Sequence, residues 1–190
     1  MEFRKGRAEI ENYVVYSEEG EIIRVIEKSE ENTLKPEEWL RGVTCFLINK
    51  QGQVLLETRG KNEEDAGVFD LCSGHVNKGE MTIHAIVREL REELNVPFEV
   101  ACNVKKVLDF ELQTRKNQNF FVTAYALFLG DFEVRPQKEE VAEISFKSRE
   151  EVYDLLRMNQ TRIRYNETWE EVFEKVEKLC KEKLVVEDNC

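Results

Sequence analysis

Three carboxylates in the middle of the chain have the spacing of a divalent-metal site. Glu89, Glu92 and Glu93 fall within an arc of about 100° on a helix that advances about 100° per residue. Carboxylates this close repel one another strongly unless cations lie among them. Oxygen ligands of this kind suit Mg²⁺ or Mn²⁺, which also bind substrate phosphates. The pattern therefore indicates metal-assisted chemistry, although an ordinary Glu-rich amphipathic helix would show the same periodicity.

The segment Thr82–Leu94 must position these carboxylates, and its apolar residues predict one amphipathic helix with a continuous stripe facing the core. Pro97 marks the exit from this helix. The loop before it contains Gly74, whose missing side chain lets a backbone carbonyl approach a metal, and Gly79, which permits a sharp turn. The apolar stripe consists of Ile83, Ile86, Val87, Leu90 and Leu94.

The stretch Gly74–Val96 resembles the Nudix box, G-x5-E-x7-R-E-U-x-E-E-x-G-U, in which U is an aliphatic residue. It matches this pattern at every position but one, where Asn95 replaces the usual glycine. That position needs a left-handed backbone conformation, and asparagine is the best substitute for glycine there. The resemblance implies the Nudix α/β/α sandwich, an α/β fold with a mixed β-sheet.

The resemblance also implies a function and a set of metal ligands. Glu89, Glu92 and Glu93 would bind Mg²⁺ or Mn²⁺ together with the carbonyl of Gly74, and Glu89 is also a candidate to activate water. The protein would then be a hydrolase that cleaves a diphosphate linkage by metal-activated water. A nucleoside diphosphate or a derivative of one is the expected small-molecule substrate.

Other residues receive supporting roles from the same resemblance. Arg88 and Glu80 would form an ion pair that orients the catalytic helix without touching the substrate. Arg59 ends a strand near the expected cleft, where it could bind a substrate phosphate or simply be solvated. His75 could contact a phosphate or a metal, or could stabilise its loop by a hydrogen bond.

A further carboxylate from a loop often assists in this family. Three glutamates before the last expected strand are candidates, although surface charge is the favoured explanation for any one of them. They are Glu139, Glu140 and Glu143.

The N-terminal hairpin and three later segments together look like the branch of the family that is similar to isopentenyl-diphosphate isomerase. The later segments are Gly42–Asn49, Val54–Arg59 and Val68–His75. The isomerase needs a catalytic cysteine immediately before the Gly-His pair, but Ser73 occupies that place and Cys72 lies one residue earlier. Most other isomerase residues are also missing, so hydrolysis is the favoured reading and isomerisation the alternative. A catalytically silent Nudix domain that binds a nucleotide or a protein is a third possibility, and the complete set of carboxylates argues against it.

The rest of the chain divides into an N-terminal hairpin extension at 1–38, a Nudix domain at 39–158 and a C-terminal helical extension at 159–190. Apolar and β-branched runs predict two hairpins, two long strands and a short last strand. Ser148, with a glutamate three residues later, predicts a capped helix. The expected strands are Tyr13–Tyr16, Glu21–Ile26, Gly42–Asn49, Gln53–Thr58, Val68–Cys72, Phe98–Leu112, Asn119–Leu129 and Ile144–Phe146, and a last helix is expected within Asn166–Leu184.

Composition excludes several classes of protein. The net charge of −11 disfavours a nucleic-acid-binding face, which needs clustered lysine and arginine. Five widely spaced cysteines and two histidines give neither a disulfide framework nor a zinc site. No apolar run is long enough to cross a bilayer, and the N-terminus lacks the pattern of a signal peptide. We therefore expect a cytoplasmic enzyme without a membrane or nucleic-acid partner, and a homodimer stays open.

Overall fold

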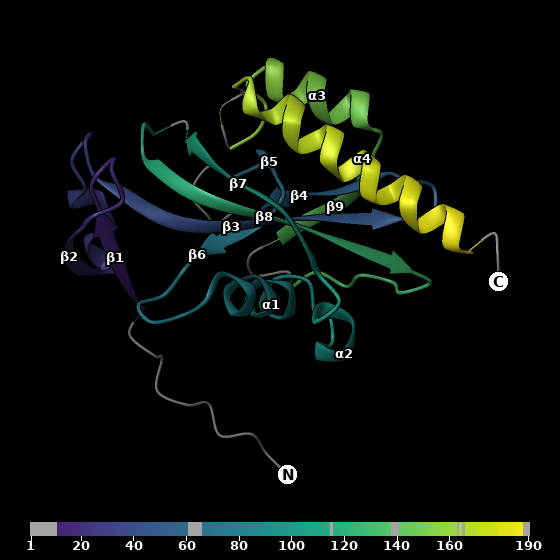
Figure 1. Cartoon of the computed structure of the whole chain (residues 1–190), viewed down its shortest axis with the longest axis horizontal. Helices are drawn as coiled ribbons and strands as arrows, with labels where there is room; N and C mark the ends of the chain where they lie inside the picture. Colours follow the sequence, from purple (N-terminus) through teal and green to yellow (C-terminus); the bar gives the residue numbers. More distant parts are fainter. Residues whose placement is uncertain are drawn as a thin grey trace, which may run out of the picture.

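The computed structural model describes residues 11–60, 66–114, 116–137, 141–162, 164 and 166–187. They form a nine-stranded mixed sheet between two pairs of helices (Figure 1). Helices α1 (Thr82–Glu92) and α2 (Phe98–Ala101) cover one face of the sheet. Helices α3 (Arg149–Arg157) and α4 (Thr168–Glu187) cover the other face. This arrangement confirms the expected α/β/α sandwich.

The centre of the sheet is the parallel pair of β3 (Trp39–Asn49) and β8 (Asn119–Gly130). Two strands pair antiparallel with this centre, β7 (Lys105–Gln113) with β8 and β6 (Cys72–His75) with β3. Side chains along β3 alternate between the two faces. Cys45 and Leu47 enter the core under α1, whereas Phe46 and Ile48 enter the core under α3 and α4.

A second group of strands lies beside this centre. β4 (Val54–Arg59) pairs antiparallel with β5 (Phe69–Asp70) and with β9 (Val141–Lys147). The hairpin expected from β3 and β4 is present, and its strands have nearly the expected bounds. Within the described residues the two strands pair only at Ile48 and Val54. The consecutive strands β5 and β6 therefore pair with different neighbours, β5 with β4 and β6 with β3.

The N-terminal hairpin and the C-terminal helix both pack on the rest of the sheet. β1 (Asn12–Tyr16) and β2 (Ile22–Glu27) form the N-terminal hairpin, which joins β3 through Tyr16 and Trp39. A short 3₁₀ helix, η1 (Lys28–Thr33), follows it. Helix α4 buries Trp169, Val172, Phe173 and Val176 against the sheet.

The two helix ends that the sequence singled out have the expected geometry. Ser148 accepts the backbone N–H of Glu151, whose side chain accepts the N–H of Ser148, so the capping box at α3 is confirmed. Asn95, three residues after the end of α1, adopts a φ of 51°, the left-handed conformation expected for the glycine that it replaces. Its side chain also donates to the carbonyl of Arg135 at 2.8 Å, which fixes the exit of the helix.

Two expected strands differ in the structure. The segment Val68–Cys72 was expected to be one strand, but its residues are divided between β5 and β6, with Leu71 between them. The segment Phe98–Leu112 was expected to be a single strand, but it begins with the helical turn α2 and becomes strand only at Lys105. Pro97 has a φ of −66° and its carbonyl accepts the N–H groups of Val100 and Ala101. The apolar residues Val100, Ala101 and Val104 therefore follow a helical spacing on the α1 face, which the alternating pattern of Phe98, Val100 and Val104 concealed.

The described helices include none with the length and apolar character needed to span a membrane.

Candidate active site

Arg88 on α1 is the centre of a hydrogen-bond network that holds the helix against the preceding loop. Its Nε and Nη2 donate to the two carboxylate oxygens of Glu80 at 3.0 and 3.1 Å. Nη2 also donates to the carbonyl of His75 at 2.9 Å, and the backbone N–H of Asn77 donates to Glu80 at 3.0 Å. The expected ion pair of Arg88 and Glu80 is therefore present, and it ties α1 to both ends of the loop.

The same guanidinium reaches two of the candidate metal ligands. Arg88 Nη1 donates to Glu89 Oε1 at 2.7 Å and to Glu92 Oε2 at 3.2 Å. Glu92 is more than half exposed on the outer side of the helix. A cation bound by Glu89 and Glu92 would therefore share these oxygens with Arg88.

Glu89 packs directly on the backbone of Gly74 in β6. A Cβ added at Gly74 would lie 1.9 Å from Glu89 Oε1 and 2.1 Å from its carboxylate carbon. Only glycine leaves room for a carboxylate at this position. Burial raises the pKa of Glu89 to about 7, although the charge and hydrogen bond of Arg88 oppose this rise.

Glu93 belongs to a second cluster, deeper under the helix. Ligand atoms of Glu93, Glu57 on β4 and Cys72 on β6 all lie within 4.8 Å of one another, which within the described residues occurs only here. Burial, followed by the charge of Glu57, raises the pKa of Glu93 well above its usual range. Burial and the same two carboxylates also raise the pKa of the Cys72 thiol.

The two clusters together fit a divalent cation. Glu93 Oε2 is buried and has no hydrogen-bond partner within the described part of the chain. A buried carboxylate oxygen without a donor costs stability unless a cation satisfies it. The donor set is mainly carboxylate oxygen with the carbonyl of Gly74 nearby, the chemistry that Mg²⁺ and Mn²⁺ prefer.

The structure brings two of the three expected metal ligands close to the sheet and leaves the third exposed. Glu89 and Glu93 both turn toward the sheet, whereas Glu92 lies at the exposed side beside Arg88. Sequence reasoning missed Glu57, which completes the cluster around Glu93. Its signal was present, because Glu57 is a charged residue directly after the apolar run Val54–Leu56 of a buried strand.

The raised pKa of Glu89 predicts a pH-dependent stability in the metal-free protein. Its ordinary pKa is 4.5 and its folded-state pKa is about 7, so the folded state holds the proton more tightly than the unfolded state. The contribution to stability is fully present below pH 4.5 and is lost as the pH rises through 7. We expect this fall in the melting temperature between pH 5 and pH 8 to be smaller in Glu89→Gln, by calorimetry with a chelator. Identical pH profiles for both proteins would contradict the assignment.

His75 lies away from the carboxylates of α1, on the opposite face of the sheet. Its ring stacks on Tyr13 at a centroid distance of 4.5 Å and meets the ring of Phe120 edge-on. Its Nε2 is 3.2 Å from Glu31 Oε1 in η1. The aromatic contacts and the pairing with Glu31 support a structural role for this side chain in joining the N-terminal hairpin to the sheet.

Arg59 takes part in a buried charge cluster. Asp70 on β5 is almost fully buried, and its Oδ2 lies 3.7 Å from Arg59 Nη1 and 3.6 Å from Arg162 Nη1. Leu71 N–H and the Ser73 hydroxyl also donate to this carboxylate. The sequence did not single out Arg162, because this residue follows α3 in a segment that contains no recognisable motif.

The candidate loop carboxylates are not brought to the site by the described structure. Glu139 and Glu140 lie outside the described residues. Glu143 lies within β9 rather than in a loop, because the strand begins three residues earlier than expected. It pairs with Thr58, whereas Glu57 pairs with Ile144. Since side chains alternate along a strand, Glu143 points to the face opposite Glu57.

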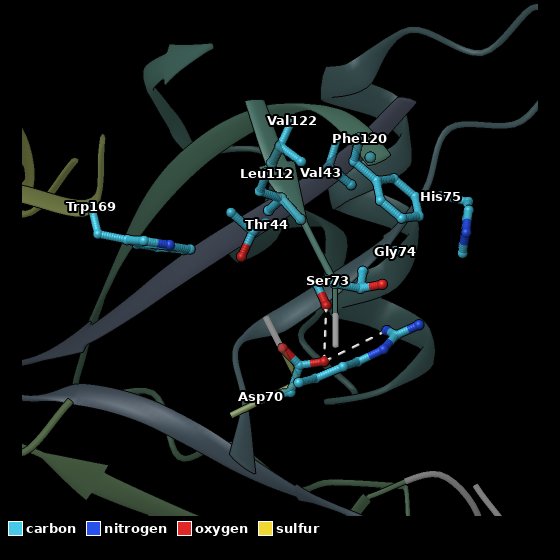
Figure 2. Close-up of a pocket in the computed structure, with 13 residues that line it drawn as sticks. Val43, Thr44, Asp70, Ser73, Gly74, His75, Leu112, Phe120, Val122 and Trp169 are labelled. Carbon is cyan, nitrogen blue, oxygen red and sulfur yellow. Dashed lines mark hydrogen bonds and ion pairs between the residues drawn. The ribbon is translucent and has the colours of Figure 1, made fainter. Parts of the chain in front are cut away.

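A cavity adjoins this site on the other face of the sheet, below α4 (Figure 2). Its volume is about 50 Å³, and Gly74 and Ser73 of β6 line it together with Asp70 and Arg162. Gly74 therefore touches both the carboxylate of Glu89 and the cavity.

Solved structures of other proteins share this fold. The structure of DR0079 from Deinococcus radiodurans superposes with a TM-score of 0.66 at 23% identity, covering 86% of this chain and 98% of that one. A MutT protein from Methanosarcina mazei gives 0.55 at 20% identity over 74% of this chain and 94% of that one. An Ap4A hydrolase from C. elegans gives 0.53 at 16% identity over 74% and 99%.

Sequence comparison adds a curated relative, the CTP pyrophosphohydrolase of Escherichia coli K12. It is 37% identical over 54 residues, which is 28% of this chain and 40% of that protein. The chain thus matches less than half of this relative. Residues 38–169 match the NUDIX domain family. This span includes the hydrogen-bond network of Arg88, the contact of Glu89 with Gly74 and the cluster of Glu57 and Glu93. The chain belongs to the Nudix family.

Proposed function

We propose that the protein is a divalent-metal-dependent pyrophosphohydrolase that cleaves the diphosphate linkage of a nucleoside di- or triphosphate. The observation that carries this proposal is the seating of Glu89 on Gly74 beside the buried oxygen of Glu93. Two carboxylates with raised pKa values are held there by backbone and helix packing, ready for a cation. Perturbed carboxylates in a built site favour catalysis over a purely structural role.

The residues would divide the work as follows. Glu89, Glu92, Glu93 and the Gly74 carbonyl would hold the cation, with Glu57 completing the cluster. When bound, the cation would neutralise the diphosphate and lower the pKa of a water molecule. A bound cation would favour the ionised form of Glu89, and the ionised carboxylate would accept a proton from the attacking water. Arg88 and Glu80 keep α1 in register with the loop and do not touch the reacting atoms.

Hydrolysis is favoured over isomerisation by the surroundings of Ser73. Its hydroxyl donates to Asp70 at 3.3 Å, and the neighbouring thiol of Cys72 is buried between Glu57 and Glu93 rather than exposed in the cavity. A catalytic cysteine at the cavity, which the isomerase requires, has no counterpart at this place. The name of the E. coli relative supports nucleoside triphosphates as the first substrates to test.

A panel of substrates with and without metal tests the proposal. We expect release of phosphate or pyrophosphate from at least one nucleoside di- or triphosphate with Mg²⁺ or Mn²⁺, and none with a chelator. Isopentenyl diphosphate serves as the control for isomerisation. Turnover that is unchanged by the chelator, or isomerisation without hydrolysis, would refute the proposed function.

Metal binding is tested separately from turnover. We expect Mn²⁺ to raise the melting temperature of the wild type by mass action, because a cation that binds only the folded state stabilises it. The shift should largely disappear in the Glu57→Gln/Glu93→Gln variant. An equal shift in the wild type and in this variant would mean that the cluster does not bind the cation.

A further inference from the structure

The walls of the cavity below α4 suit a flat apolar ring. Its lining includes Leu112 on β7, Phe120 and Val122 on β8, and Trp169 on α4, which stand around it in Figure 2. All four side chains belong to the core on this face of the sheet. A volume of about 50 Å³ exceeds the roughly 15 Å³ that one water molecule needs, so a small ring can enter. Because this volume is small, we expect the single ring of a pyrimidine to fit better than the fused rings of a purine.

Thr44 supplies a hydrogen-bonding group that has no partner inside the protein. It lies on β3 with its hydroxyl toward the cavity, and it is only 4% exposed. Its Oγ1 makes no hydrogen bond to any described residue. A buried hydroxyl without a partner is costly, and buried polar groups of folded proteins are nearly always satisfied. A ligand with an acceptor in the cavity would satisfy it.

Arg162 supplies a charged donor at the same cavity. Asp70 holds its guanidinium at 3.6 Å from one side, while the backbone N–H of Arg162 donates to the carbonyl of Phe69 at 3.0 Å. Asp70 in turn accepts a hydrogen bond from Ser73. Arginine carries five donors, and among the described residues no further ion pair of this guanidinium is found, so its other N–H groups can serve a ligand.

The cavity is connected to the catalytic side through Gly74. One side of Gly74 receives the carboxylate of Glu89, and the same residue lines the cavity. A ligand in the cavity would therefore lie one strand away from the carboxylates of α1.

We propose that the cavity binds the base of a pyrimidine nucleotide, with Thr44 and Arg162 donating hydrogen bonds to the ring carbonyl O2. This inference rests on the proposed function, because it names the substrate class of the same site. Both cytosine and uracil carry the O2 acceptor, and either ring presents its two apolar faces to Phe120 and Trp169. The C-terminal segment that bears Arg162 and Trp169 is thereby part of the substrate site.

Binding of nucleoside monophosphates to the full chain, measured by calorimetry with a chelator present, tests the inference without hydrolysis. We expect CMP and UMP to bind at least tenfold more tightly than AMP and GMP. Thr44→Val keeps the shape of the side chain and removes the hydroxyl, so it should weaken pyrimidine binding about tenfold. Arg162→Gln should weaken it similarly and serves as the second variant if Thr44→Val fails to fold.

Thr123→Val is the matched control. This substitution on β8 also replaces a threonine hydroxyl with a methyl group. The hydroxyl of Thr123 donates to Asp109, and Thr123 does not line the cavity. It should leave CMP binding unchanged. Equal binding of purine and pyrimidine nucleotides, unchanged binding in both Thr44→Val and Arg162→Gln, or no binding of any monophosphate would overturn the inference. Failure of the proposed function would instead appear as absent hydrolysis in the metal-containing panel.

Discussion

Replacing Glu89 with glutamine is expected to lower kcat by about a thousandfold or more while the fold is kept. Glutamine has nearly the same shape, so it still fits against Gly74, but it carries no charge for a cation and cannot accept a proton from water. Arg88 loses one carboxylate partner and keeps Glu80 and Glu92. The melting temperature of the metal-free protein above pH 7 should therefore not fall greatly, since a carboxylate with a raised pKa is removed.

Glu80→Gln is the matched comparison, because it removes one carboxylate charge from the same network. Glu80 accepts two hydrogen bonds from Arg88 and one from the backbone of Asn77. Its loss should cost roughly 2 kcal/mol of stability and leave kcat reduced only mildly. Steady-state kinetics at saturating Mg²⁺, with thermal unfolding of both variants, separates the two roles. Equal losses of kcat with unchanged melting temperatures would place Glu80 among the catalytic groups.

The sequence predicted the elements around the site because local rules governed them. The stripe of α1, the capping box at Ser148 and the left-handed Asn95 each depend on a few neighbouring residues, and each is present in the structure. The turn α2 was missed where two periodicities fitted the same apolar residues. There the geometry of Pro97 and packing against the α1 core decided between them.

The site was predictable only along the helix. Arg88 and Glu80 are eight residues apart and pair as expected. Glu57 reaches Glu93 only because β4 and α1 are brought together by the sheet, and no spacing in the sequence encodes that contact. Thr44 and Arg162 are similarly joined by the cavity alone. Non-local side chains of this kind require the strand order and register, which local patterns do not determine.

Gly74→Ala should abolish most activity although it replaces no side chain of the Arg88 network. The backbone of Gly74 is not in the left-handed region, so alanine itself is not strained by its φ. The added Cβ would instead occupy the position of Glu89 Oε1, at a distance of 1.9 Å. The side chain of Glu89 is flexible and can rotate away, so we expect a folded protein whose carboxylate has left the site.

The expected results are a loss of kcat of at least about a hundredfold, and a smaller Mn²⁺-induced rise of the melting temperature than in the wild type. Because both changes act through one carboxylate, Gly74→Ala in a Glu89→Gln background should cost little further activity. Gly42→Ala is the control, since its Cβ would meet Phe120 at 3.3 Å and the carbonyl oxygen of Gly74 at 3.4 Å, an ordinary contact distance, but no carboxylate of α1. It should leave the response to Mn²⁺ intact. If the losses of kcat in the double variant were multiplicative, Gly74 would act independently of Glu89. The contact between Glu89 and Gly74 would then not explain why this position needs glycine.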